Sequence, residues 1–267
     1  MSLAIRNARD PGGQRHLLRD RVYGEVRRRI VSGDLSPGDE LSIEGVAIAY
    51  GVSRTPVREA LLQLAEEELV VVVPQVGASV ALIDLRKVYE AQFVREVLER
   101  ACLAAGAEVA HAEILASLGK ALRVQGAAIR EREPAEFYRC DEIFHNLLCS
   151  MSGHSGISRI TNSARGHLDR LRQLSLRNNF ALMETLYAEH RTLVEALRQG
   201  DFAKADQTLR GHLRRIFRYA DDLRQRHPEF FVEQGVELPP RGDAVAALGR
   251  FHSSGDVTLS LNSAAGS

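Results

Sequence analysis

The chain has 267 residues, of which 45% are hydrophobic and 26% charged, a composition typical of soluble globular proteins with one large or two medium domains. No apolar run approaches the roughly 20 residues that span a bilayer. Residues 1–15 lack the apolar core of a signal peptide, so we expect a cytoplasmic protein without a membrane partner. The formal net charge of zero argues against a non-specific coat on nucleic acid.

The N-terminal segment predicts an arm followed by two helices. Residues 1–14 show no periodicity and contain Pro11-Gly12-Gly13, which is typical of a flexible arm. From Leu17 to Ser32, apolar residues recur at helical spacing. Ser42 can cap a second, short helix over residues 43–50.

Residues 51–61, with the sequence GVSRTPVREAL, have the pattern of the turn and second helix of a helix-turn-helix. Gly51 suits the tight turn between two helices, and Ser53 is a favoured N-cap residue. Pro56 fits the first helical turn, where its missing N–H group has no cost. The segment therefore predicts an element that lies in a DNA major groove.

The helix predicted over residues 54–67 presents Arg54, Thr55 and Arg58 near its start. Because Arg54 and Arg58 are four residues apart, they share one face of the helix. An arginine at this position can donate to guanine O6 and N7 or hold a phosphate. Acidic residues outnumber arginines over residues 15–80, so binding has to depend on where these arginines lie.

A short hairpin is predicted after this helix. Residues 69–73 form a β-branched run, and residues 78–80 follow the turn signal Pro74-Gln75-Val76-Gly77. A hairpin in this position is the wing of a winged helix-turn-helix. We therefore expect a DNA-binding domain over residues 15–82.

After residue 83 the strand signals end and helical patterns follow. Asp84 can cap the first of about six helices, and the fold class is mainly α, with a C-terminal all-helical bundle over residues 84–227. Cys102, Cys140 and Cys149 lie in these patterns without a C-x-x-C pair, which indicates buried reduced thiols. Residues 228–267 lose the periodicity, which predicts a disordered tail with a short helix at 243–249. The predicted bundle helices cover residues 85–109, 112–132, 134–151, 156–177, 180–199 and 201–226.

Four residues of the bundle have the chemistry of a metal site. Asp141 and His145 are four residues apart and project from one helix face. His190 and His212 follow on two later helices joined by a tight turn, which allows them to converge with the first pair. Three imidazoles and a carboxylate suit a divalent metal such as Zn²⁺, Ni²⁺ or Mn²⁺. The alternative is a chance spacing, since a D-x-x-x-H pattern is common.

The chain resembles the GntR family of bacterial transcription regulators, in its FadR branch. The N-terminal resemblance rests on the ordered segments Ile30 to Leu41 and Gly51 to Leu61, followed by a wing that contains Gly77. One departure is Glu68, where the family usually has glycine before the wing. The resemblance implies DNA contacts from Ser53, Arg54, Thr55 and Arg58, with the wing tip, Gln75 to Gly77, in the minor groove.

The C-terminal resemblance covers residues 84–226 and rests on the segments Arg95-Glu96-Val97-Leu98-Glu99, Asp141 to His145, Glu189-His190 and Gly200 to Leu213. It implies that Asp141, His145, His190 and His212 are metal ligands beside which a small carboxylate effector binds. Arg95 matches the family position that pairs with the effector's acid group, although an ion pair to Glu99 is the rival interpretation. Arg172 is a second candidate for the effector pocket.

These observations predict a homodimeric, ligand-responsive regulator, more specifically a repressor, that binds a palindromic operator in double-stranded DNA. We expect no enzymatic activity, because the DNA-binding domain provides a complete role for the chain. One alternative is a metal-dependent enzyme that carries a DNA-binding domain. The other is an effector-insensitive DNA-binding protein with a structural metal.

Overall fold

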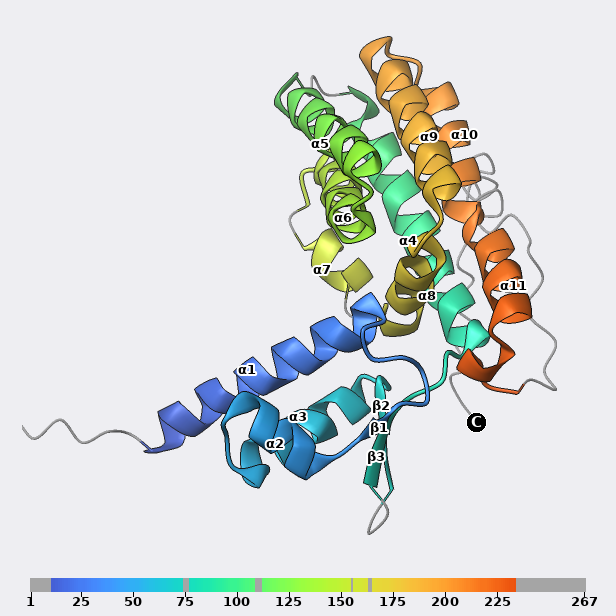
Figure 1. Cartoon of the computed structure of the whole chain (residues 1–267). Coiled ribbons are helices and arrows are strands. Elements are labelled where there is room, and N and C mark those ends of the chain that lie inside the picture. Colours follow the sequence, from blue (N-terminus) through green and yellow to red (C-terminus); the bar gives the residue numbers. More distant parts are fainter. Residues whose placement is uncertain (1–10, 74–76, 109–111, 155, 163–164, 234–267) are drawn as a thin grey trace, which may run out of the picture. The chain divides into compact units, whose positions relative to one another are not determined.

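The computed structural model describes residues 11–73, 77–108, 112–154, 156–162 and 165–233 (Figure 1). Its N-terminal part contains three helices, α1 (Pro11–Ser32), α2 (Ile43–Tyr50) and α3 (Arg54–Glu66). Helix α1 begins at Pro11, six residues before the predicted start at Leu17, so the arm expected at 1–14 is wrong from residue 11 onwards. Proline is compatible with this start because the first N–H groups of a helix need no partner within it.

The turn between α2 and α3 follows the prediction closely. The side chain of Ser42 accepts a hydrogen bond from the backbone N–H of Gly45 and caps α2. Gly51 ends α2 with φ of 64°, in the left-handed region that glycine adopts without steric cost. Ser53 occupies the N-cap position of α3 in an extended conformation, but its side chain makes no capping hydrogen bond. The local sequence therefore fixes the turn, and the Ser53 hydroxyl is not used to hold it.

A three-stranded antiparallel sheet follows, in the order β1-β3-β2. Strands β2 (Val70–Val73) and β3 (Gly77–Val80) form the predicted wing, with Val70 opposite Val80. Strand β1 (Glu40–Leu41) has no sequence signal of its own and pairs with β3. One apolar core joins the helices to this sheet; its buried members include Val22, Ile30, Val57, Leu61, Leu64, Leu69 and Val80.

Glu68, which stands where the related family usually has glycine, adopts φ of 58° immediately before the wing. A residue with a Cβ atom is strained in this left-handed conformation, which explains the preference for glycine. The Glu68 carboxylate lies 2.5 Å from Lys87 Nζ on the surface. Such an exposed pair offsets little of the strain.

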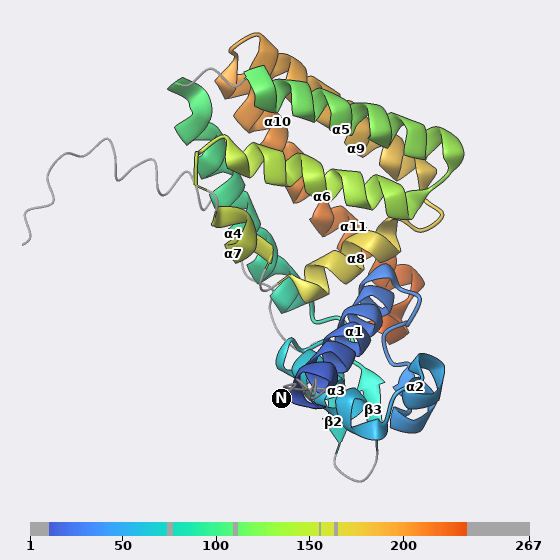
Figure 2. The same cartoon turned by 90° about the vertical axis from the view of Figure 1, so that its left-hand side faces the viewer.

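The C-terminal part is a bundle in which α5 packs against α6, and α9 against both α10 and α5 (Figures 1 and 2). Its largest apolar core includes Leu118, Phe144, Leu148, Leu193 and Leu209. The three cysteines are free and buried, as predicted. The bundle helices are α4 (Leu85–Ala105), α5 (Ala112–Glu131), α6 (Pro134–Ser150), α7 (Ile157–Asn162), α8 (Gly166–Leu176), α9 (Phe180–Arg198), α10 (Phe202–Arg214) and α11 (Ile216–Arg226).

Two helices predicted as single elements are each divided. The segment 156–177 forms α7 and α8, and the segment 201–226 forms α10 and α11. At the second division, Arg215 N–H donates to the carbonyl of His212, a three-residue spacing that interrupts the α-helical pattern. Neither a proline nor a glycine marks the bend at Arg215. The bend lets α10 pack against α4 and α9 while α11 packs against α8. The apolar periodicity of the sequence does not show which helices pack together, so it did not predict this bend.

The tail predicted from residue 228 is wrong for its first six residues. Pro228–Phe230 form a 3₁₀ turn, and Phe231 pairs with Ile83 in a parallel bridge. Phe231 is buried, so its apolar ring holds this segment against the start of the bundle. The rest of the predicted tail, with the helix at 243–249, lies outside the described residues. Among the described residues, no helix is long and apolar enough to cross a membrane.

Candidate functional site

The fold brings Asp141, His145, His190 and His212 together in the interior of the bundle. Their ligand atoms, from α6, α9 and α10, all lie within 4.8 Å of one another, and all four residues are buried. His212 Nε2 lies 3.2 Å from the Nε2 atoms of both His190 and His145. Asp141 completes the group, with Oδ1 3.5 Å from His190 Nε2 and Oδ2 3.8 Å from His145 Nε2.

Each imidazole is held from behind by an oxygen acceptor. Glu99 Oε2 lies 2.6 Å from His145 Nδ1, Gln125 Oε1 lies 3.1 Å from His190 Nδ1, and Glu189 Oε2 lies 3.0 Å from His212 Nδ1. With the acceptors on this side, each ring carries its proton on Nδ1 and turns an Nε2 lone pair toward the shared centre. The ring of Phe144 stacks on His190 with centroids 4.0 Å apart and further fixes its orientation.

These three acceptors were not predicted as part of the site. For Glu189 the sequence carries a signal, since it directly precedes His190 on a helix. Glu99 has the i, i+4 spacing to Arg95 that suggests only an ion pair. Gln125 has no signal, because its role depends on the packing of α5 against α9.

Burial sets the charge state of the cluster. It lowers the pKa of His145 well below the usual range, and the nearby Arg95 guanidinium lowers it further. Burial, with the neighbouring His212, lowers the pKa of His190 to about 3. Burial acts to raise the pKa of the Asp141 carboxyl, but the charge of Arg172 overcomes it and holds that pKa at about 2. The neutral imidazoles of His145 and His190 and the ionised carboxylate of Asp141 are in the protonation states that bind metal.

The geometry fits a divalent cation. With metal–nitrogen bonds of about 2.0–2.1 Å, ligand atoms around one ion lie roughly 3–3.5 Å apart. The Nε2 atom of His212 lies at 3.2 Å from the Nε2 atoms of His145 and His190, and all four ligand atoms lie within 4.8 Å of one another. Without a cation, three nitrogen lone pairs would face one another in a buried space, which is electrostatically unfavourable. Imidazole and carboxylate ligands suit zinc, nickel or manganese.

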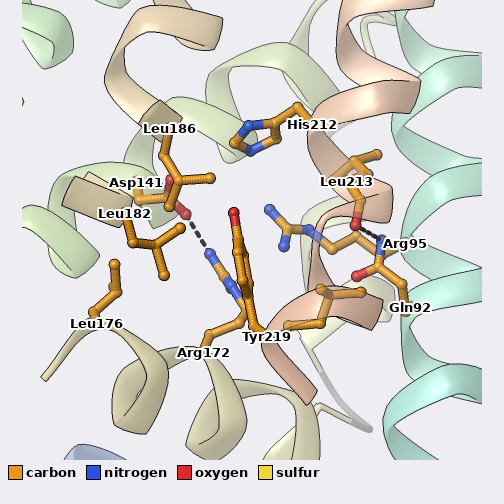
Figure 3. Close-up of a pocket in the computed structure, with 11 residues that line it drawn as sticks. Gln92, Arg95, Asp141, Arg172, Leu176, Leu182, Leu186, His212, Leu213 and Tyr219 are labelled. Carbon is orange, nitrogen blue, oxygen red and sulfur yellow. Dashed lines mark hydrogen bonds and ion pairs between the residues drawn. The ribbon is translucent and has the colours of Figure 1, made fainter. Parts of the chain in front are cut away.

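A pocket of about 40 Å³ opens beside the cluster, lined by residues of α4, α6, α8, α9, α10 and α11 (Figure 3). Arg95 lies in its wall, and its Nε donates to Glu99 Oε1 at 2.7 Å. The ion pair to Glu99, one of the two interpretations of Arg95, is therefore present. However, Nη2 of Arg95 is buried without a hydrogen-bond partner among the described residues, so the guanidinium keeps a donor for a ligand.

Arg172 also lines the pocket, but its guanidinium is engaged. It donates to Asp141 and Glu142, and it lies over the ring of Tyr138 with its central carbon 4.9 Å from the ring centroid. These contacts favour a role in holding the Asp141 carboxylate in place. Direct capture of an effector by Arg172 would require it to leave a partner.

At the other candidate surface, α3 exposes Ser53, Arg54, Thr55 and Arg58 at its N-terminal end. Arg54 forms an ion pair with Glu44 of α2 at 3.0 Å, and both side chains are more than 60% exposed, so the pair is weak. Arg58 makes no hydrogen bond or ion pair within the described part of the chain. Gln75 lies outside the described residues.

At the wing, Gly77 begins β3 with φ of 148°, a backbone conformation that residues with a side chain rarely adopt. Among the residues that the structure describes, no atom beyond its chain neighbours lies within 4 Å of the position that a Cβ would take there. The glycine therefore serves the backbone path of the wing and leaves room for a close partner.

Comparisons with known proteins identify both parts of the chain. Residues 18–80 match the family described as bacterial regulatory proteins, gntR family, and residues 88–215 match the FCD domain. The chain is 36% identical to an HTH-type transcriptional regulator in an unstable DNA locus of Streptomyces ambofaciens, over 84% of this chain and 94% of the relative. It is 29% identical to the HTH-type transcriptional repressor RspR of Escherichia coli K12, over 80% and 93%. The structure of E. coli McbR/YncC has the same fold, with a TM-score of 0.65 and 21% identity over 79% and 98% of the two chains.

Proposed function

Because this chain belongs to the GntR family of bacterial transcription regulators and not to a family of enzymes, we propose that it is a repressor whose DNA binding responds to a small carboxylate effector. Residues 15–82 would bind the operator. The bundle from residue 84 would bind the effector beside a metal ion. The observation that carries the proposal is the combination, in one chain, of an exposed arginine pair on α3 and a buried His/Asp cluster with a pocket beside it.

For DNA binding, we assign base contacts to Arg54 and Arg58 and phosphate contacts to Ser53 and Thr55. Helix α3 would lie in the major groove, where the unpaired Arg58 can fork onto a guanine. Arg54 would leave its weak pair with Glu44 to do the same. Gln75 and Gly77 of the wing would contact the adjacent minor groove.

For the metal, Asp141, His145, His190 and His212 would be the four ligands of a zinc, nickel or manganese ion. Such an ion supplies a Lewis acid that can bind a carboxylate oxygen at an open coordination position. Glu99, Gln125 and Glu189 would fix the ligand rings and raise their basicity. The chain's own part in effector capture then falls to Arg95, whose unpaired nitrogen faces the same pocket. Arg172 would hold Asp141.

We further propose that the protein acts in the cytoplasm as a homodimer on a palindromic operator. Phe93 and Val94 of α4 and Ile160 of α7 are apolar yet 54%, 42% and 61% exposed, and α4 contacts α7. Apolar side chains gathered in this way are typical of a surface that a second subunit covers.

The experiment begins with the full-length, zinc-loaded protein selecting its own sites from a library of random DNA duplexes. We expect a palindromic consensus. Binding to that consensus is then measured by fluorescence anisotropy with a set of small carboxylic acids added one at a time. At least one acid should change the affinity by about 5-fold or more, the lower end of usual allosteric coupling. If no acid changes it while zinc stays bound, the metal is structural and DNA binding is insensitive to effectors.

A further inference from the structure

The pocket beside the metal cluster has a polar side and an apolar side. Together, the two sides limit which carboxylic acids can bind there. Building on the proposed function, we propose that the effector is a short aliphatic hydroxy monocarboxylate, such as a branched 2-hydroxy acid, and not a polyhydroxy acid or a dicarboxylate. Three features of the pocket carry this inference: one free cationic donor, the buried amide oxygen of Gln92 that needs a donor, and an apolar wall.

The first feature is the buried guanidinium of Arg95. Its Nε is held by Glu99, while Nη2 has no hydrogen-bond partner in the described residues. A buried charged donor without a partner is costly, so this position favours an anionic oxygen from a ligand. Of the two arginines that line the pocket, Arg172 already donates to Asp141 and Glu142. The pocket therefore offers one guanidinium for one acid group.

The second feature is the Oε1 atom of Gln92, which is buried and without a hydrogen-bond partner among the described residues. Gln92 Nε2 donates to the carbonyl oxygen of Leu213 at 2.9 Å, and this bond fixes the amide because a carbonyl can only accept. The other end of the amide, Oε1, is therefore an acceptor that needs a donor. A ligand hydroxyl supplies that donor.

The third feature is the wall opposite Arg95 and Gln92, formed by Leu176, Leu182 and Leu186 (Figure 3). These side chains offer only carbon to a ligand, so an aliphatic tail gains by contacting them. A hydroxyl placed there would lose water without gaining a partner, at a cost of about 1–3 kcal/mol. A polyhydroxy acid, with a hydroxyl on each carbon, cannot avoid that wall.

The size of the cavity agrees with a small ligand. Its volume is about 40 Å³, which favours a short acid over a long acyl chain. A carboxylate, one hydroxyl and a short branched tail match the three features together.

The test uses the full-length, zinc-loaded protein and four acids in calorimetric titrations: 2-hydroxy-3-methylbutanoate, 3-methylbutanoate, gluconate and malate. We expect 2-hydroxy-3-methylbutanoate to bind most tightly. Its advantage over 3-methylbutanoate, which lacks the hydroxyl, should be about 5- to 100-fold, because without that group the buried Oε1 of Gln92 stays unpaired. Gluconate and malate should bind at least 10-fold more weakly, since they place polar groups against the leucine wall.

Two variants assign the preference to the pocket. Gln92→Met should bring the affinities of the two methylbutanoates within about 3-fold of each other while 3-methylbutanoate itself still binds. Leu182→Asn should weaken 2-hydroxy-3-methylbutanoate and reduce its advantage over gluconate, whereas Leu182→Met should change neither. Unfolding temperatures of the variants show whether each is folded before its titration is interpreted.

The outcomes separate this inference from the function on which it rests. If gluconate or malate binds more tightly than 2-hydroxy-3-methylbutanoate, the hydroxy monocarboxylate is excluded and the carboxylate effector stands. If 3-methylbutanoate binds as tightly as 2-hydroxy-3-methylbutanoate, the role of Gln92 is overturned. If none of the four acids binds the zinc-loaded protein, the inference is overturned, and the anisotropy measurements with the wider set of acids decide whether any carboxylate is an effector.

Discussion

Glu99 offers the sharpest test of the metal site, because it touches a ligand without being one. We predict that Glu99→Gln weakens zinc binding while the bundle stays folded. The Glu99 carboxylate lies 2.6 Å from His145 Nδ1 and 2.7 Å from Arg95 Nε, and it is 2% exposed. An amide keeps the shape of the side chain, but it removes the charge that holds the proton on Nδ1 and makes Nε2 a stronger donor to the metal.

The expected loss follows from these contacts. Removing the group that orients a metal-binding histidine typically costs 10- to 100-fold in metal affinity, or about 1.4–2.7 kcal/mol. Because the contact to His145 is short, charged and shielded from water, we expect the upper half of this range. Glu99→Asp, which keeps the charge but withdraws it by one methylene group, should fall between the wild type and Glu99→Gln.

Metal affinity is measured by titrating the metal-free protein with Zn²⁺ against a chromophoric chelator of known affinity. Glu136→Gln is the matched control, because Glu136 is an exposed residue of α6 that pairs with Arg139. Near-ultraviolet circular dichroism shows whether each variant is folded. A folded Glu99→Gln protein that binds zinc within 2-fold of the control would refute the proposed role of Glu99.

Three further predictions concern other parts of the chain. Arg58→Ala should weaken binding to the selected operator by about 1–3 kcal/mol in fluorescence anisotropy, and Arg139→Ala should not; equal affinities would remove Arg58 from the interface. Glu68→Gly should raise the free energy of unfolding by about 0.5–1 kcal/mol in urea titrations, because it relieves a left-handed φ of 58°, and a loss of stability would contradict that origin of strain. His167, whose pKa burial lowers to about 4, accepts the Asp84 backbone N–H at Nδ1 and has to stay neutral, so stability should be present above pH 6.5 and fall toward pH 4. In His167→Gln, the loss of unfolding free energy between pH 6.5 and pH 4 should be smaller by up to about 3 kcal/mol. An unchanged dependence of stability on pH would contradict this role of His167.

The elements with strong local signals could be predicted from the sequence. The glycine turn at Gly51, the Ser42 cap and the wing strands each depend on residues a few positions apart, and all three are present. The bend at Arg215 was not predicted, because Gly211 lies one turn before it and no residue at the bend itself interrupts a helix. The chain bends there to satisfy packing between distant helices. Phe231 was missed for the same reason, since its partner Ile83 is far away in the sequence.

The candidate site shows the same contrast between residues with local sequence signals and residues whose role depends on packing. Asp141 and His145 could be placed on one helix face by spacing. The tight turn between two later helices allowed His190 and His212 to converge with them, and the resemblance to a family supported the same four residues. The acceptors behind the rings depend on which helices become neighbours, so Gln125 carries no local sign of its role. Arg95 shows the limit of choosing between two interpretations: one nitrogen of its guanidinium pairs with Glu99, and another faces the pocket unpaired.

The convergence of three helices on one point has a mechanical consequence. His190 and His212 are 22 residues apart, and His145 and His212 are 67 apart. An ion bound by all three would cross-link the chain, closing loops whose freedom the unfolded state otherwise keeps. In the chain-entropy description, closing even a 15-residue loop contributes about 3 kcal/mol. A metal here would cross-link α6, α9 and α10. Removing it with a chelator would therefore lower the stability of the whole bundle as well as leave the metal site vacant.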